Sequence, residues 1–92
     1  MAEISVKGRL VCRTPAEAAA VRRHLPAHIA ATRAEPGCLS FDVAPTDDPL
    51  VWQVQETFVH RAAFDAHQTR TQASAWAAAT AGIPREYTVT EG

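Results

Sequence analysis

The segment ETFVHRAAFDAHQ, residues 56–68, joins a strand pattern to a helix pattern and decides how the chain is expected to fold. Apolar and polar residues alternate up to Phe58, which is typical of a strand with one buried face, and Glu56 lies on that apolar face. After residue 60 the apolar residues follow helical spacing, on which His67 lies one step from Phe64. The segment therefore predicts a carboxylate and an imidazole on one apolar surface, between a strand and a helix.

Alternation and helical spacing extend this pattern over the rest of the chain. The expected strands are residues 3–12, 38–43, 50–58 and 84–90. The expected helices are residues 14–34, one from about residue 60, and one over roughly 70–82. Their order, β-α-β-β-α(α)-β, is that of the split βαβ, ferredoxin-like fold, with helices packed on an antiparallel sheet. We therefore expect an α+β protein with a single domain over residues 1–92.

Several local signals refine the expected elements. Thr14, Pro15 and Glu17 form a helix start, in which Glu17 reaches back to complete a capping box. Pro26 lies inside the same helix and predicts a kink. The residues expected to face the sheet from this helix are Ala18, Val21, Leu25, Ile29 and Thr32. The residues expected on the apolar face of the second strand are Leu39, Phe41 and Val43.

The composition is that of a small folded domain and argues against several classes of partner. Hydrophobic residues make up 47% of the 92 residues, the formal net charge is −1, and there is no basic run. This balance argues against nucleic acid or an anionic membrane as the main partner. No apolar run approaches membrane-spanning length, and the charged N-terminus does not resemble a secretion signal. Cys12 and Cys38 lack metal-binding spacing and do not make a disulfide framework, so we expect reduced thiols in a cytoplasmic protein.

The sheet face away from the helices is expected to be polar with few charges. Its residues are Ser5, Lys7, Arg9, Ser40, Gln53, Gln55, Thr57 and Thr88. A chain of this length buries only a modest share of its surface, so pairing this face with a second copy would add buried area. We therefore expect a homodimer.

Glu56 and His67 admit two interpretations. A buried carboxylate is costly unless it is paired, so Glu56 needs a partner such as His67, an arginine or helix N–H groups. The pair could be catalytic, with His67 as a weak base tuned by Glu56. Alternatively, it is a structural pair that fixes the helix on the sheet. The residues alone leave both interpretations open.

Aromatic side chains are the candidate walls of a substrate-binding pocket. They are Phe41, Trp52, Phe58, Phe64, Trp76 and Tyr87. Aromatic residues at such spacing also form ordinary cores, but the alanine-rich last helix could leave room for a flat ligand beside them. Arg85 would lie near the rim, where it could meet an anionic substrate.

Three further histidines are assigned no chemistry. His24 and His28 have the spacing of metal ligands on a helix, but no third ligand is evident, so we interpret them as solvent-exposed and expect no metal site. His60 stands where a helix cap is expected.

Two motifs resemble those of a known family. The segments ATRAEPGCLSFDV (31–43) and ETFVHRAAFDAHQ (56–68) are similar to the antibiotic biosynthesis monooxygenase (ABM) family of small dimeric α/β-barrel proteins. In the second segment the resemblance rests on Glu56, Phe58, Ala63 and His67. It implies a homodimer whose strands form a shared barrel. It also implies oxygenase chemistry without metal, flavin or haem, because the electron-rich substrate itself activates oxygen.

Two departures narrow this resemblance. The haem-degrading branch of the family uses an asparagine on the first strand and a histidine late in the second helical region. This chain contains no asparagine, and its late stretch SAWAAATAG (74–82) has no histidine, so haem degradation is not expected. Many members also carry a tryptophan at the end of the third strand and a second histidine after the AH pair. Here the strand ends in Phe58 instead of a tryptophan. After His67, the segment QTRTQASAW (68–76) has no second histidine and offers only Gln72 and Trp76 in its place.

Three functions are compatible with these residues. The first is a cofactor-independent monooxygenase that uses O2 on a small aromatic or quinol-type molecule, with His67 and Glu56 as catalytic residues. The second is a non-catalytic small-molecule binder or structural dimer, and the third is an isomerase of a small carbonyl compound. The fold does not decide among them. A cavity beside His67 that is large enough for an aromatic ring would favour the first, and a filled core would favour the second.

Overall fold

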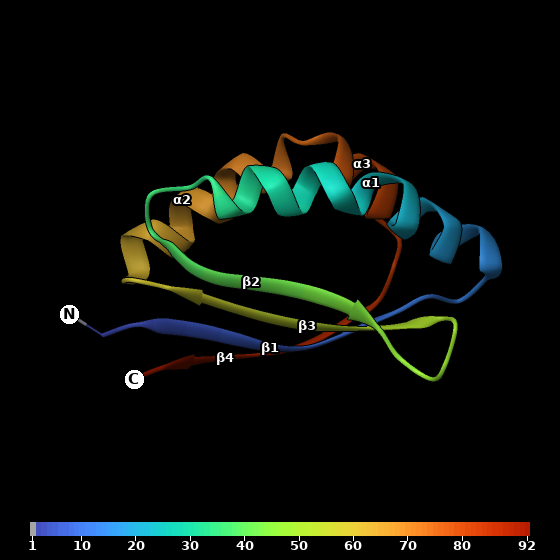
Figure 1. The fold of residues 1–92 in the computed structure, drawn as a ribbon, viewed down its shortest axis with the longest axis horizontal. Helices are drawn as coiled ribbons and strands as arrows, with labels where there is room; N and C mark the ends of the chain where they lie inside the picture. The colour runs from blue at the N-terminus through green and yellow to red at the C-terminus, as the bar shows by residue number, and fades with distance from the viewer. Residues whose placement is uncertain (1) are drawn as a thin grey trace.

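The computed structural model describes residues 2–92 and places them in two layers, a sheet and a layer of helices (Figure 1). The strands are β1 (Ile4–Val11), β2 (Cys38–Pro45), β3 (Val51–Phe58) and β4 (Arg85–Glu91). The helices are α1 (Pro15–Arg33), α2 (Arg61–Gln72) and α3 (Ala75–Thr80). The strands pair antiparallel in the order β2-β3-β1-β4. The predicted α+β, ferredoxin-like βαββαβ fold is therefore confirmed.

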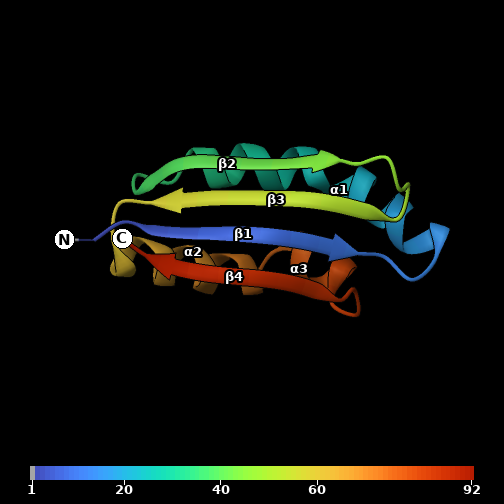
Figure 2. The same cartoon turned by 90° about the horizontal axis from the view of Figure 1, so that it is seen from below.

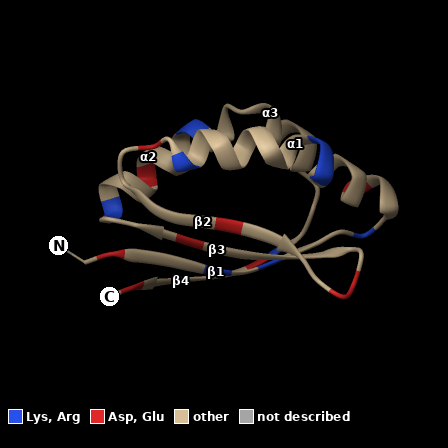
Figure 3. Ribbon diagram, viewed as in Figure 1, with Lys and Arg blue, Asp and Glu red and all other residues tan. Residues whose placement is uncertain are grey.

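All three helices lie on one face of the sheet, and within residues 2–92 no helix lies on the other (Figures 1 and 2). Strand pairing places Ser5 opposite Thr57 and Lys7 opposite Gln55, as the predicted polar face requires. Charged residues of both signs are interspersed along the two layers (Figure 3). None of the described helices has both the length and the apolar character needed to cross a bilayer.

Helix α1 begins as predicted, but its capping pattern differs in one bond. The Thr14 hydroxyl accepts a hydrogen bond from the backbone N–H of Glu17 (3.2 Å). The Glu17 carboxylate accepts from the backbone N–H of Arg13 (2.7 Å), one residue before the position that a capping box uses. The reason is that the same carboxylate pairs with the Arg13 guanidinium (2.6 Å). Pro26 does not end the helix, which continues to Arg33.

The face of α1 toward the sheet differs from the prediction by one residue. Its buried residues are Ala18, Val21, Leu25, His28 and Thr32. Ile29 is only partly buried, whereas His28, which was expected in solvent, is 6% exposed. At 3.6 residues per turn, the side chains three and four residues after Leu25, those of His28 and Ile29, both lie near the face of Leu25. In this helix it is His28 that is buried.

A β-bulge changes the face assignment at the start of β2. Cys38 pairs with Phe58 and Ser40 with Thr57, so Leu39 is an extra residue in this strand. Leu39 is 52% exposed, and the prediction that it shares the apolar face with Phe41 and Val43 is wrong. Cys38 takes the inward position instead and packs against the apolar cluster formed by Ile4, Val6, Phe58 and Phe64.

The second helical region divides later than the sequence pattern predicted. α2 continues to Gln72, and α3 covers only Ala75–Thr80 instead of roughly 70–82. The division falls at Ser74, whose hydroxyl caps α3 by accepting a hydrogen bond from the Ala77 backbone N–H (3.2 Å). His60 caps α2 through its Nδ1, which confirms the helix-cap prediction for this residue.

Candidate active site

A cavity of about 310 Å³ lies between the sheet and the helices. All four strands and all three helices contribute side chains to its walls. Glu56 and His67 both lie on these walls, β3 carrying the carboxylate and α2 the imidazole. The surface on which alternation and helical spacing placed them is therefore the lining of a cavity.

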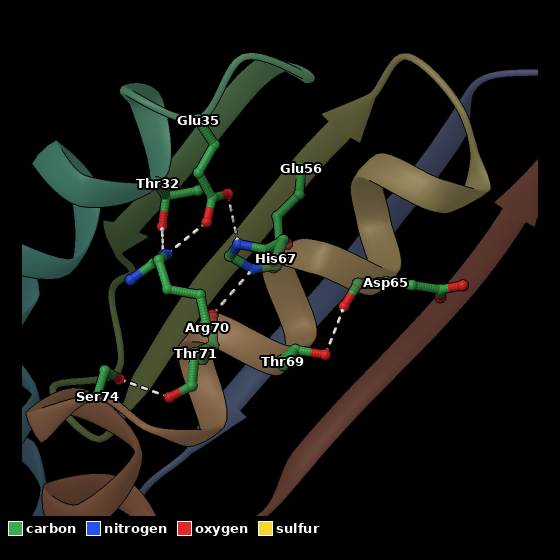
Figure 4. Close-up of polar contacts among 9 residues, drawn as sticks. All are labelled: Thr32, Glu35, Glu56, Asp65, His67, Thr69, Arg70, Thr71 and Ser74. Atoms are coloured by element: carbon green, nitrogen blue, oxygen red, sulfur yellow. Dashed lines mark hydrogen bonds and ion pairs between the residues drawn. The ribbon is translucent and has the colours of Figure 1, made fainter.

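His67 is 3% exposed, and its two ring nitrogens face different groups (Figure 4). Nδ1 lies 2.9 Å from Oε1 of Glu35. Nε2 lies 3.5 Å from Oε1 of Glu56 and 3.5 Å from the Thr71 hydroxyl, both longer than a strong hydrogen bond. When Nδ1–H donates to the Glu35 carboxylate, the lone pair of Nε2 is free on the side of Glu56 and the cavity.

Glu35 is a site residue that the sequence did not reveal, because EPG (35–37) reads only as the end of a helix. Its second carboxylate oxygen accepts a hydrogen bond from Nε of Arg70. Arg70 also donates from Nη2 to the Thr32 hydroxyl (3.0 Å), so α1, α2 and the loop after α1 are joined by one polar network (Figure 4). This network fixes the orientation of the carboxylate that holds His67.

Gly37 allows this network to close. A Cβ at this position would lie 2.3 Å from the Cβ of Ala63, which is closer than two carbon atoms can pack. Only glycine therefore lets α2 approach the loop after α1 this closely. The close approach brings Glu35 and His67, 32 residues apart in the chain, within hydrogen-bond distance.

Glu56 is 7% exposed, and the ionisable side chain paired with it among residues 2–92 is His67, with Nε2 at 3.5 Å. Burial, with the nearby charge of Glu35, raises the pKa of Glu56 to about 7. Burial lowers the pKa of His67, although Glu35 acts in the opposite direction. Near neutral pH the imidazole is therefore neutral and Glu56 can both hold and release a proton, as acid–base chemistry requires.

His28 is a second cavity residue that the sequence did not reveal. Its ring stacks on Trp76 with 4.6 Å between centroids and 2° between planes, and it meets Phe41 edge-on at 5.2 Å. Nδ1 is buried and has no hydrogen-bond partner in the described chain. Burial lowers the pKa of His28 to about 4, so the ring is neutral at neutral pH. The sequence feature that could have indicated its burial is its position three residues after Leu25, on the same side of the helix.

The six predicted aromatic residues divide into two sets. Phe41, Trp76 and Tyr87 line the cavity. Trp52, Phe58 and Phe64 do not, because they pack in hydrophobic clusters on either side of it. Trp52 and Phe58 stand at the two ends of β3, and at about 3.3 Å per residue they lie too far apart to share a small cavity. Only the middle of the strand, at Val54 and Glu56, reaches the cavity.

Strand β4 adds a phenol and a cation to the wall. Tyr87 lies opposite Gly8, where a Cβ would come within 2.8 Å of the tyrosine ring. The residue is 37% exposed, and partial desolvation at the cavity wall raises the pKa of Tyr87 to about 12, so its hydroxyl stays protonated. Arg85 donates to the backbone oxygens of Thr80 (2.9 Å) and Ile83 (3.0 Å), which are neutral acceptors. Within residues 2–92 no carboxylate forms a salt bridge with it.

The described residues contain no group of three or more His, Cys, Asp and Glu side chains that could hold a metal ion. His24 and His28, whose spacing suggested such a group, have separate environments, because His28 points into the core and His24 is only partly buried.

The protein is thus a small α+β domain with a cavity between its sheet and its helices. On the wall of this cavity, the imidazole of His67 is held by the carboxylate of Glu35. Residues 13–79 match the family model described as antibiotic biosynthesis monooxygenase, which covers most of the chain. The chain therefore belongs to the ABM family, as the resemblance of its motifs indicated. A comparison with curated protein sequences finds no match.

Several solved structures share this fold over nearly the whole chain. Rv0793 from Mycobacterium tuberculosis is 29% identical, with a TM-score of 0.74 over 96% of this chain and 92% of that one. NE2512 from Nitrosomonas europaea, a protein of unknown function, is 23% identical, with a TM-score of 0.78 over 100% and 90%. SnoaB from Streptomyces nogalater, a cofactor-independent oxygenase, is 17% identical, with a TM-score of 0.72 over 100% and 94%.

Proposed function

We propose that the protein is a cofactor-independent monooxygenase that uses O2 to oxidise a small aromatic or quinol-type molecule. The observation that carries the proposal is the buried imidazole of His67, held at Nδ1 by Glu35 (2.9 Å) on the wall of a partly aromatic cavity. Family membership and the shared fold of SnoaB, a cofactor-independent oxygenase, add to this support.

The size of the cavity suits an aromatic substrate. A dry cavity of about 150 Å³ in another protein binds benzene, and this cavity measures about 310 Å³. Phe41 and Trp76 offer flat apolar surfaces, and Tyr87 and Gln72 add polar atoms that could orient a ring. We assign Phe41, Trp76 and Tyr87 to substrate contact, with Phe58 and Phe64 packed behind the base.

The proposed reaction begins with a proton. Nε2 of His67 accepts it from a substrate hydroxyl, and the Glu35 carboxylate stabilises the imidazolium that forms. The resulting anion passes one electron to O2, and the superoxide and the substrate radical combine to a peroxide at a ring carbon that bears hydrogen. A proton from His67 or Glu56 converts the peroxide to a hydroperoxide. Loss of the hydrogen on that ring carbon to the base as a proton then forms the carbonyl and breaks the O–O bond, and the departing hydroxide takes a proton to leave as water. One oxygen atom ends in the product and one in water, and the substrate supplies all four electrons.

Oxygen uptake tests this proposal. A panel of quinols and hydroxyaromatics is added to the purified protein in an oxygen electrode, and the rate is corrected for autoxidation without protein. We expect one O2 consumed for each oxygenated product, a quinone from a phenol or a hydroxyquinone from a quinol, and no hydrogen peroxide released. Conversion of a carbonyl compound without oxygen uptake would favour the isomerase, and ligand binding without any turnover would favour the binder.

The bare sheet face leads to a proposal about assembly. It carries polar residues such as Lys7, Gln53 and Gln55, and no helix in the described part of the chain covers it (Figure 1). On the other face of the sheet, the edge strand β4 leaves Tyr87 (37% exposed) and Val89 (46% exposed) partly uncovered, so a partner would cover apolar surface there as well. We propose that the bare face pairs with a second copy, so that the strands form a shared barrel. Light scattering at micromolar concentration is expected to give twice the mass of the chain, and a monomer would contradict the proposal.

The mechanism proposed above uses no cofactor, and this too can be tested. The absorption spectrum of the purified protein is expected to lack flavin and haem bands, and elemental analysis is expected to find no stoichiometric metal. Either signal in active protein would contradict the proposal.

A further inference from the structure

His28 is a buried side chain with a ring nitrogen that forms no hydrogen bond within residues 2–92. This nitrogen is Nδ1, and the side chain is 6% exposed and lines the cavity. Unpaired buried polar atoms are uncommon in folded proteins, and an unpaired N–H is less common than an unpaired acceptor. The arrangement therefore favours the tautomer with a lone pair at Nδ1 and the proton at Nε2. Because Nδ1 is sealed off, Nε2 is the nitrogen through which this ring can reach a ligand.

The position of the ring is fixed by its neighbours. Trp76 stacks against it at 4.6 Å and Phe41 meets it edge-on at 5.2 Å, so the imidazole has little freedom to rotate. The centroid of His28 lies 6.1 Å from that of His67. One small aromatic molecule in the cavity can therefore contact both imidazoles.

Burial is the main reason that the His28 ring stays neutral, and the charges of Arg70 and Arg85 also act against a proton on it, whereas Glu35 acts for it. Arg85 lines the same cavity, where its positive charge favours a negative ligand. A neutral imidazole that donates an N–H is a suitable group to stabilise an oxyanion, because it loses no proton to the ligand.

We propose that His28 is a substrate-binding residue whose Nε2–H donates a hydrogen bond to the oxygen that becomes negative when His67 removes the substrate proton. The proposal rests on the proposed function, since it names the group that holds the anion formed in its first step. It assigns different tasks to the two imidazoles. His67 accepts the proton, and His28 stabilises the charge that remains on the substrate.

The test measures binding of two probes, without turnover and under nitrogen. 4-Nitrophenol can ionise and gain the proposed hydrogen bond as its anion, whereas 4-nitroanisole has the same ring and cannot ionise. His28→Phe keeps an aromatic ring against Trp76 and removes the N–H. Hydrogen bonds to charged groups contribute enough for us to expect binding of 4-nitrophenolate about ten- to a hundredfold weaker in this variant. Binding of 4-nitroanisole should be unchanged within about twofold.

Two controls keep the result interpretable. His24→Phe makes the same substitution one turn earlier on α1, away from the cavity, and should change neither affinity. His28→Gln restores an N–H donor and should recover part of the preference for the anion. Nitrogen NMR of the wild-type protein needs no variant, and the His28 ring signals should shift when 4-nitrophenol binds and stay in place when 4-nitroanisole binds.

Several results would overturn the proposal. Equal binding of the anion by wild type and His28→Phe would show that the N–H makes no contact. Equal loss of both probes would show that the ring acts only by packing against Trp76. Failure of wild type to bind either probe would also overturn it. Oxygen uptake by the quinol panel tests the proposed function separately, so each idea can fail without the other.

Discussion

His67 and His28 line the same cavity from α2 and α1, and both are buried, but their partners differ. His67 has a carboxylate on each side, at 2.9 Å and 3.5 Å, whereas His28 has aromatic rings and no partner at Nδ1. Burial lowers the pKa of both rings, and only at His67 does a directly bonded carboxylate act against it. Polar partners, more than burial, therefore decide which of two buried histidines can take up a proton.

The largest expected effect is at the base. His67→Ala is expected to lower turnover of an accepted quinol or aromatic by roughly 10²–10⁴-fold, the range for losing a general base. The melting temperature should change only modestly, because the lost side chain borders a cavity. Oxygen uptake and thermal unfolding are measured on the same samples, with His24→Ala as the control. A destabilised but fully active variant would leave Glu56 and His67 as a structural pair.

Glu35→Gln is expected to have a smaller effect on the same reaction. Glutamine can still accept a hydrogen bond from Nδ1–H, but it removes the charge that stabilises the imidazolium, so turnover should fall by about ten- to a hundredfold. Glu35 raises the pKa of both His67 and Glu56, so both should titrate at lower pH in the variant. NMR titration measures this shift, and Glu91→Gln, in an exposed ion pair with Arg61, is the matched control. Unchanged titration would disconnect Glu35 from the base.

The third prediction uses the pH dependence of stability. The folded-state pKa of His28, about 4, lies below its ordinary value of 6.5, so the free energy of unfolding falls as pH decreases from about 6.5 to 4. The folded-state pKa of Glu56, about 7, lies above its ordinary 4.5, so the free energy of unfolding falls as pH rises from about 4.5 to 7. Each contribution is roughly 3 kcal/mol at most, since one pKa unit corresponds to about 1.4 kcal/mol.

Single variants separate these two opposing contributions. Relative to wild type, His28→Phe should gain stability as the pH is lowered below about 6.5. Glu56→Gln should instead gain stability as the pH is raised above about 4.5. Urea unfolding at a series of pH values measures both. A pH-independent difference for either variant would show that its group does not titrate as its surroundings indicate.

The smallest expected effect is at Thr71. Its hydroxyl lies 3.5 Å from Nε2 of His67, too far for a strong hydrogen bond, so Thr71→Val should change turnover by less than about threefold. Steady-state oxygen uptake measures the change. A loss comparable to that of Glu35→Gln would contradict this and mean that the hydroxyl donates a hydrogen bond that orients Nε2.

Much of the architecture was predictable because it depends on short-range periodicity. Alternation in β3 placed Glu56 on the inner face, and helical spacing placed His67 on the face of α2 that meets it. The capping signals of Thr14 and His60 were correct for the same reason, since they act within three residues.

The residues that were missed depend on features that no local pattern encodes. Glu35 reaches His67 only because Gly37 lets a loop and a helix from distant parts of the chain pack closely. His28 and Ile29 both fit a helical stripe from the preceding turn, and the packing of Trp76 against one of them decides which is buried. The bulge at Leu39 likewise arises from strand pairing.

His67 takes its orientation from the loop after α1, whereas α3 and β4 supply other parts of the cavity wall, among them Trp76, Ala77 and Tyr87. The pair Glu35–His67 and the cavity wall from α3 and β4 therefore lie in different segments of the sequence. Under the proposed function, substitutions at Trp76, Ala77 or Tyr87 would change the shape of the molecule that fits the cavity and leave Glu35 and His67 in place. With this arrangement, related proteins can evolve different substrate preferences through single substitutions in α3 and β4, while the proposed proton acceptor, His67, and its partner Glu35 stay the same.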